Sequence, residues 1–343
     1  DMNLYDILST GLQADASDIH IKAGIPPVYR IDGTLKTLGK MPRLSPDATH
    51  KIAMEIMNES QREHFEKNHE LDLAYGVPGL GRFRVNAFSQ RGSVSLVLRA
   101  IPFGVKTLDE LRLPVVLKKI AEENRGMILV TGATGSGKST TLAALIDHIN
   151  SARTAHIVTI EDPIEFLHRD KKSIINQREI GCDTSSFNSA LKSALRQDPD
   201  IILLGEMRDL ETIETALTAA ETGHLVLSTL HTNDSASAIT RLMEMGLPSY
   251  LIASSLECVV AQRLARRVCP NCAHSVTLTP SKMTAEEHDF LQVTKATIAK
   301  PVGCKSCFNS GYSGRIGLFE VLPVSREIRA LVLEHASADE LRD

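Results

Sequence analysis

Tryptophan is absent from this chain of 343 residues, and aromatic residues make up only 4% of it. So few aromatics argue against a platform for single-stranded nucleic acid or an aromatic-lined sugar site, because both hold their ligands by stacking. Long apolar runs are also missing, since none exceeds about five residues and a membrane-spanning helix needs about twenty. The first residues lack the basic and then apolar profile of a signal peptide. We therefore expect a soluble chain that works in the cytoplasm.

Neither charge sign dominates, because 38 Lys and Arg stand against 42 Asp and Glu, for a net charge of −4. This balance excludes a global positive field that would recruit nucleic acid or anionic lipid. Apolar residues make up 43% of the chain, enough for a real core, which excludes disordered and collagen-like chains. The length predicts two domains of ordinary size and a small extra module.

Cysteine is scarce, and four of the six cysteines form two CxxC pairs separated by 31 residues. The pairs are Cys269 with Cys272 and Cys304 with Cys307. This is the spacing of two zinc knuckles that close one tetrahedral site, which leaves no position for water and indicates a structural metal. Unpaired thiols, or His274 in place of one cysteine, are the alternatives. The two isolated cysteines, Cys182 and Cys258, are predicted to be small buried side chains.

Residues 1–100 mix short strands with helical segments, which predicts an α+β domain with an antiparallel sheet. Strict alternation predicts a strand pair over 81–90 and 93–100, turning at Gly92. Asp32-Gly33 predicts a second hairpin turn, and apolar spacing predicts one helix from His50 to Phe65.

A linker rich in breakers follows at 101–114, and the pattern then changes. In residues 115–265, β-rich runs alternate with helical stretches, which predicts an α/β domain with a mostly parallel sheet. Residues 266–320 are rich in Cys, Gly and Pro and predict a metal-held module, with a helical segment at 321–343.

The segment from Gly132 to Ser139 fits GxxxxGK[ST], follows a β-rich run and precedes a helical pattern. Its glycines allow backbone N–H groups to surround a phosphate, Lys138 supplies a positive charge, and the hydroxyl of Ser139 is a ligand for Mg²⁺. We predict an ATP site. Its predicted contacts are Gly132, Thr134, Gly135, Ser136, Gly137, Lys138, Ser139 and Thr140.

A nucleotide site also needs an acid for Mg²⁺ and a group that orients the attacking water. Glu206 follows the apolar strand at 201–204, as in a Walker B motif. Glu161 and Glu165 are both candidate general bases, and their spacing does not choose between them. His224 and His231 flank the run at 225–230 and are candidate sensors of the γ-phosphate.

Three further segments carry a resemblance to a known family: TIEDPIE at 159–165, RQDPDIILLGEMRD at 196–209 and TAAETGHLVLSTLHT at 218–232. They closely resemble the Asp box, Walker B motif and His box of the secretion and type IV pilus motor ATPases. ASDIHIKAGIPPVYRIDG at 16–33 and RFRVNAF at 82–88 resemble the pilus retraction (PilT-like) subfamily, as does Met207.

This resemblance implies a RecA-like ATPase domain after an N-terminal PAS-like domain, and a ring of six subunits. It implies that Glu165 is the catalytic base, that Glu206 acts on Mg²⁺, and that His224 and His231 couple the γ-phosphate to domain movement. It also implies that arginines of the N-terminal domain reach the phosphates. Arg84 and Arg99 match best, and Arg82 is a further candidate.

The resemblance further implies that ATP hydrolysis drives pilus retraction at the cytoplasmic face of the inner membrane. The partner would be a membrane platform protein, with no nucleic acid involved. The tetracysteine segment departs from this subfamily and resembles the extension (PilB-like) and type II secretion (GspE-like) ATPases. The helical ending typical of retraction motors is not evident after Glu320, so we expect a truncated chain or a different subfamily.

Two rivals from other classes remain. A nucleic-acid translocase is disfavoured by the net charge and the few aromatics, and a regulatory nucleotide-binding module without turnover is disfavoured by Lys138, Glu165 and Glu206.

Overall fold

The computed structural model describes residues 3–31, 34–101, 104–279, 283, 296–307 and 309–342. The predicted turn at Asp32-Gly33 lies outside these residues. The chain forms two compact units. The first unit comprises Asp1–Val105, Ile160–Asp170 and Gln177–Ala190, and the second comprises Lys106–Thr159, Lys171–Asn176 and Leu191–Asp343.

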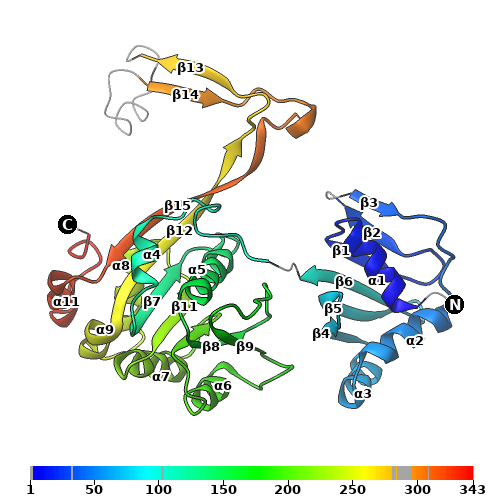
Figure 1. Cartoon of the computed structure of the whole chain (residues 1–343), viewed down its shortest axis with the longest axis horizontal. Coiled ribbons are helices and arrows are strands. Elements are labelled where there is room, and N and C mark those ends of the chain that lie inside the picture. Colours follow the sequence, from blue (N-terminus) through cyan, green and yellow to red (C-terminus); the bar gives the residue numbers. More distant parts are fainter. Residues whose placement is uncertain are drawn as a thin grey trace. The chain divides into compact units, whose positions relative to one another are not determined.

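The N-terminal part of the first unit is built on an antiparallel sheet in the order β3-β2-β1-β6-β5-β4 (Figure 1). Its elements are α1 (Leu4–Gln13), β1 (Asp18–Ile21), β2 (Val28–Ile31), β3 (Thr34–Thr37), α2 (Pro46–Ile56), α3 (Glu59–Asn68), β4 (Glu70–Val77), β5 (Gly81–Gln90) and β6 (Ser93–Ile101). The sheet and helices are the α+β arrangement predicted for this part of the chain.

The hairpin of β5 and β6 has the predicted register, because Gln90 pairs with Ser93. Its two turn residues, Arg91 and Gly92, both have positive φ, as a type I′ turn requires. The helix predicted over 50–65 is wrong, because the segment forms two helices. Met57 has extended backbone, and the side chain of Asn58 accepts a hydrogen bond from Gln61 and starts α3 with a capping box.

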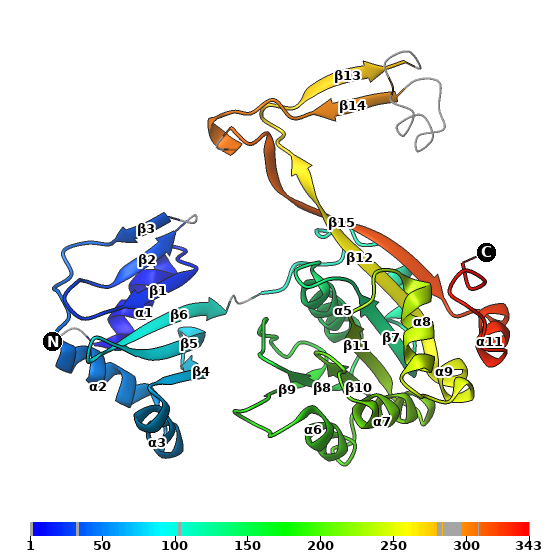
Figure 2. The same cartoon turned by 180° about the vertical axis from the view of Figure 1, so that it is seen from behind.

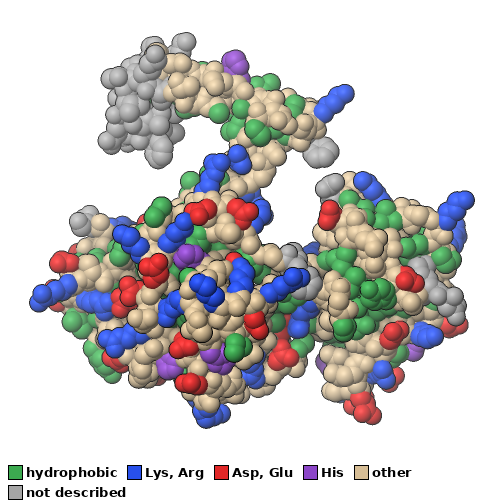
Figure 3. Space-filling model, in the orientation of Figure 1, with side chains coloured by type: hydrophobic (Ala, Val, Ile, Leu, Met, Phe, Trp, Pro, Cys, Tyr) green, Lys and Arg blue, Asp and Glu red, His purple; other side chains and the backbone are tan. Residues whose placement is uncertain are grey.

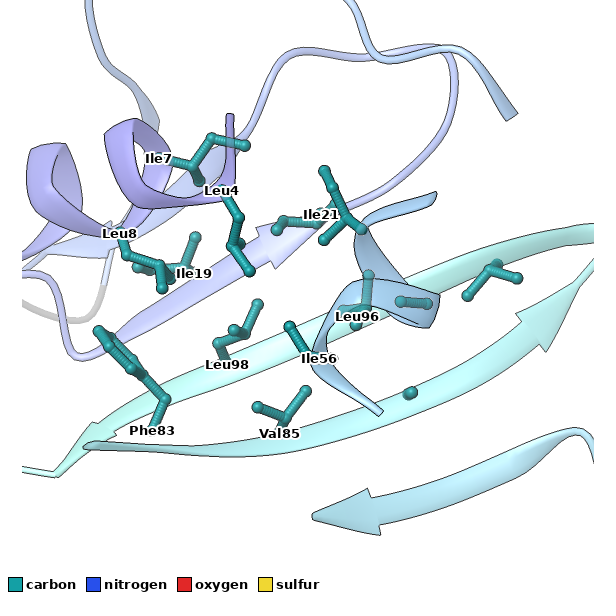
Figure 4. Packing of buried hydrophobic residues seen from close by; sticks show 14 of the residues in the cluster. Leu4, Ile7, Leu8, Ile19, Ile21, Ile56, Phe83, Val85, Leu96 and Leu98 are labelled. Carbon is teal, nitrogen blue, oxygen red and sulfur yellow. The ribbon is translucent and has the colours of Figure 1, made fainter. Parts of the chain in front are cut away.

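Buried side chains from α1, α2 and one face of the sheet form the core of this part (Figure 4). The sequence alternation accounts for the strand contribution, since Phe83, Val85 and Leu98 are fully buried. A large buried apolar cluster of this kind fixes the strand register, because a slip by one residue would turn it toward water.

The second unit contains most of a seven-stranded sheet in the order β15-β12-β7-β11-β10-β8-β9. The elements that follow β6 belong to the second unit, except that β8, β9 and α6 each have some residues in the first unit. These elements are α4 (Val116–Ile120), β7 (Gly126–Thr131), α5 (Lys138–Ala152), β8 (His156–Glu161), β9 (Ile174–Glu179), α6 (Phe187–Ala194), β10 (Ile201–Leu204), α7 (Leu210–Glu221), β11 (Leu225–Leu230), α8 (Ser235–Glu244), α9 (Ser249–Ser255), β12 (Leu256–Val268), β13 (His274–Leu278), β14 (Ala296–Lys300), a 3₁₀ turn (Lys305–Cys307), β15 (Tyr312–Pro323) and α11 (Arg326–Leu333).

The central strands β10, β11, β7 and β12 are parallel neighbours. The strands β7 and β11 are buried along their whole length, as expected for β-rich runs in a mostly parallel sheet. Helices α5 and α7 contact β7 and β11. Parallel strands bring their carboxyl ends to one edge of the sheet, so the segments after β7, β10 and β11 lie together.

Strands β12 and β15 continue beyond the sheet as a two-stranded ribbon (Figure 2). β12 pairs with β7 only over Leu256–Ala261, whereas it pairs with β15 up to Val268. The strand therefore runs without interruption across residue 265, where the sequence predicts the domain to end, and reaches the first cysteine pair. None of the helices in the described part of the chain is long and apolar enough to span a membrane.

Candidate active site

The predicted phosphate loop connects the end of β7 to the start of α5. Gly132, Gly135 and Gly137 have positive φ, which places successive N–H groups on the inside of a tight turn. The helix α5 begins at Lys138, so its N-terminal partial positive charge adds to the loop. The local sequence thus supplies the glycines and the helix start that an anion-binding loop requires.

Two observations show that this loop suits a nucleotide phosphate. The ammonium group of Lys138 lies 2.8 Å from the carbonyl oxygen of Gly132 and 3.2 Å from that of Ala133, so it stays at the loop. The hydroxyl of Ser136 is buried and has no hydrogen-bond partner among the described residues. A buried hydroxyl without a partner is costly, and an anion oxygen beside the loop would satisfy it.

Glu206 lies two residues beyond β10, at the same carboxyl edge as the loop. Its side chain is only 16% exposed and bonds the guanidinium of Arg208 at 2.6 Å. Sequence analysis does not single out Arg208. Because Arg208 is 75% exposed, it can leave, and a cation at Glu206 would compete with it for the carboxylate.

His231 directly follows β11 and lies at this edge too. Burial, and the charge of Lys138 nearby, lower the pKa of His231, which favours the neutral ring at pH 7. A neutral imidazole can accept or donate a hydrogen bond beside a phosphate.

His224 does not join this edge. It precedes β11, and its carbonyl accepts a hydrogen bond from the N–H of Gly126 at the start of β7, whereas the loop follows the end of β7. Its ring bonds the carbonyl oxygen of Ala219 at 2.9 Å. A six-residue strand separates the two histidines, about 20 Å at 3.3 Å per residue. The two positions therefore cannot contact the same phosphate within one sheet.

A pair of threonines holds the His231 segment to the phosphate loop. The hydroxyl of Thr131 accepts the N–H of Thr232 at 2.8 Å and lies 3.1 Å from the carbonyl oxygen of Leu230. Thr131 is the last residue of β7, and Thr232 follows His231. No motif pointed to this contact, because the partners lie about a hundred residues apart.

We expect Thr131→Val to lower ATP turnover about tenfold while the protein stays folded. The substitution keeps the shape and removes the hydroxyl, which leaves the N–H of Thr232 without its acceptor at a cost of about 1–3 kcal/mol. Steady-state hydrolysis of ATP measures the effect. Thr218→Val, at an exposed position of α7, is the matched control. Equal turnover of the two variants would show that the contact between Thr131 and Thr232 does not position His231.

All of the Asp box except Thr159 belongs to the first unit, and its two candidate bases have different surroundings. Glu161 ends β8 and accepts a hydrogen bond from Gln177 at 3.3 Å. Glu165 is exposed and has no ion pair or hydrogen bond within the described ranges. A carboxylate without a bound partner is better placed to take a proton from water.

Of the three candidate arginines, only Arg84 lacks an acidic partner in the described part of the chain. Arg82 bonds the buried Glu179 at 3.2 Å, and Arg99 bonds Asp18 at 2.8 Å. Arg84 instead lines a pocket of about 260 Å³ together with Asp162 of the Asp box. The geometry therefore favours Arg84 as the arginine available to a ligand.

The four paired cysteines meet at the far end of the ribbon. Their sulfur atoms all lie within 4.8 Å of one another. Burial opposes ionisation, but the N–H groups of Cys304 and Gly311 donate to the sulfur of Cys307 and lower its pKa to about 6. Four thiols at this spacing, one stabilised as thiolate, form a donor set that fits a tetrahedral metal. His274 begins β13 instead and is absent from the cluster.

The isolated cysteines differ from one another. Cys258 is fully buried in β12, as predicted, and burial raises its pKa to about 12. The prediction for Cys182 is wrong, because this residue is exposed. It follows Gly181 in the turn after β9 and lines the same pocket as Arg84.

Comparison with known proteins identifies the family of the chain. The chain matches the type II/IV secretion system protein family over residues 2–343. It is 48% identical over 273 residues to PilT, the type IV pilus retraction ATPase of Pseudomonas aeruginosa, which covers 78% of this chain and 79% of that protein. It is 35% identical over 356 residues to PilB, a type IV pilus assembly ATPase of Myxococcus xanthus, which covers 98% of this chain and 61% of that protein.

A solved structure has the same fold. It is a crystal structure of the pilus retraction motor PilT with bound ADP, 40% identical, with a TM-score of 0.79. The match covers all of this chain and 88% of that one. The chain therefore belongs to the type II/IV secretion system protein family and is an ATPase.

Proposed function

We propose that this ATPase drives type IV pilus retraction. The observation that carries the proposal is the 48% identity to a retraction ATPase, over an alignment that covers 78% of the chain. In this proposal the enzyme works as a ring of six at the cytoplasmic face of the inner membrane, against a membrane platform protein. Its N-terminal antiparallel sheet with helices is proposed to be PAS-like, and the second unit RecA-like.

The proposed chemistry is hydrolysis of Mg-ATP at the phosphate loop. Ser139 and Glu206 would hold Mg²⁺, which would supply charge neutralisation for phosphoryl transfer. Lys138 and the loop N–H groups orient the phosphates, and Glu165 takes the proton of the attacking water. Arg84, with Arg99 and Arg82 as further candidates, would supply positive charge to the phosphates. His231 would transmit the state of the γ-phosphate, whereas the position of His224 gives it no direct part in this subunit's site.

The four cysteines are proposed to hold structural Zn²⁺. We expect Cys269→Ser and Cys304→Ser, one in each pair, both to release zinc and to lower the unfolding temperature, because a closed site loses its geometry with any ligand. Metal analysis and thermal unfolding measure these effects. The exposed Cys182→Ser is the matched control. Full zinc content in either cluster variant would contradict the assignment.

A second candidate function is pilus extension or type II secretion. It is favoured by the cysteine cluster, and by an assembly ATPase that aligns with 98% of this chain. Nucleic-acid translocation has less support, because Lys and Arg are interspersed with Asp and Glu on the face in Figure 3.

Counting surface pili after deletion of the gene tests the proposal. Excess pili with loss of twitching would support retraction. Bald cells would replace it with extension, and normal pili with failed protein export would indicate secretion. Complementation with the wild-type gene and with Lys138→Ala separates loss of the ATPase from effects on neighbouring genes.

A further inference from the structure

A buried glutamine lies directly beneath the phosphate loop. Gln262 belongs to β12, is only 4% exposed, and is part of no motif in the sequence. Its side-chain nitrogen donates to the carbonyl oxygen of Ser136 at 2.8 Å. Its side-chain oxygen accepts from the hydroxyl of Thr141 in α5 at 2.7 Å. Both ends of the amide are therefore used by the loop and the helix that follows it.

The bond to Ser136 determines which way one loop peptide faces. In a planar trans peptide the C=O and the next N–H point in opposite directions. With the carbonyl of Ser136 turned toward Gln262, the N–H of Gly137 must point away from it. An anion-binding nest needs its N–H groups on one side and its carbonyls on the other. Gln262 thus orients a peptide whose N–H belongs to the nest.

The loop glycines confirm how closely Gln262 fits. A Cβ on Gly132 would lie 2.4 Å from the backbone oxygen of Gln262. A Cβ on Gly137 would lie 2.8 Å from the side-chain nitrogen of Gln262. Both distances are too short for a real carbon. Glycine is therefore needed at both positions for two reasons: it allows the positive φ angles of the loop, and it lets the loop pack closely against β12.

The support under the loop is itself rigid. Gln262 pairs with Phe319 of β15, and its neighbour Ala261 pairs with Thr131 of β7, the residue that precedes the loop. Because both flanking strands fix this backbone, the amide is held in place before any ligand binds.

We propose that Gln262 is a positioning residue that holds the phosphate loop in its anion-binding conformation. It acts through Ser136 and Thr141 and does not itself touch the nucleotide. The inference rests on the ATPase activity and is independent of which machine the enzyme drives.

The test measures equilibrium binding of a fluorescent ADP analogue to the full-length protein. We expect Gln262→Leu to weaken binding about tenfold or more, because one lost buried hydrogen bond of ordinary strength is worth about that factor. Thr141→Val keeps the glutamine but removes the donor to its oxygen, and we expect a smaller loss of a few-fold. Gln197→Leu, at an exposed position, is the matched control. Unchanged affinity in Gln262→Leu would overturn the proposal.

A second variant, which changes the shape of the side chain very little, separates the loss of the hydrogen bond to Ser136 from a disturbance of packing. In Gln262→Glu the introduced group cannot donate to Ser136 while ionised, but it can when protonated. We expect its affinity, divided by that of the wild type at each pH, to rise as the pH falls from 8 to 5.5, since burial raises the pKa of a carboxyl group. A constant deficit across this range would show a packing effect only and would also overturn the proposal.

Discussion

Lys138→Ala should abolish nucleotide binding, or reduce ATP turnover by at least about 10²–10³-fold. The side chain that is removed is the positive charge that lies at the loop, 2.8 Å from the carbonyl oxygen of Gly132. A nucleotide brings several negative charges to a partly buried edge of the sheet, where an opposite charge is worth more than in water. The loop N–H groups alone do not compensate for its loss.

Steady-state hydrolysis and binding of a labelled nucleotide measure this effect. Lys119→Ala, at an exposed position of α4, is the matched control and should leave both unchanged. Circular dichroism shows whether the variant keeps its fold. Near-normal hydrolysis by Lys138→Ala would remove the phosphate loop from the mechanism.

Glu165→Gln should keep ATP binding and lose about 10²-fold or more in turnover. The substitution leaves the size of the side chain but removes its ability to take a proton, and general bases contribute about 10²–10⁴-fold. Because Glu165 is exposed and has no hydrogen bond or ion pair within the described ranges, the change removes no such contact there. Binding should therefore survive the substitution.

Glu161→Gln is the matched comparison for this prediction. Because Glu161 accepts a hydrogen bond from Gln177, we expect the change to lower the stability of the fold more than the rate of ATP hydrolysis. Single-turnover hydrolysis at saturating Mg-ATP separates the chemical step from binding. If Glu161→Gln is the more damaging change, the base is Glu161, and the free carboxylate of Glu165 has another use.

The parts of the site that sequence analysis predicts are those encoded by neighbouring residues. The phosphate loop needs glycines at fixed offsets, a lysine at the helix start and a strand before it, all within one short segment. The spacing of the two CxxC pairs likewise predicts a metal site, and the structure brings their sulfur atoms together. The strands β7 and β11 are predicted by their β-rich runs, because strands buried on both faces lack the regular alternation of apolar and polar residues.

The parts that sequence analysis misses depend on pairs that are distant in the chain. Gln262 supports Ser136 across more than a hundred residues, and Thr131 meets Thr232 across a similar span. No local pattern identifies such partners. Arg208 lies two residues after Glu206 in the chain, yet only the geometry shows that the two are paired.

The sequence by itself determines that this chain is an α/β ATPase with a phosphate loop and a tetracysteine segment, because both features are local and chemically specific. Only the tertiary structure decides which of several similar residues takes part. It places His231 beside Lys138 and His224 at the opposite edge, since a strand separates its two ends by its own length. Among the residues that the structure describes, it also leaves Glu165 and Arg84 without a hydrogen-bond or ion-pair partner, while Glu161, Arg82 and Arg99 are bonded. The physical reason is that a side chain can react or bind a ligand only if its neighbours leave it unbonded, and those neighbours come from distant parts of the chain that only the fold brings together.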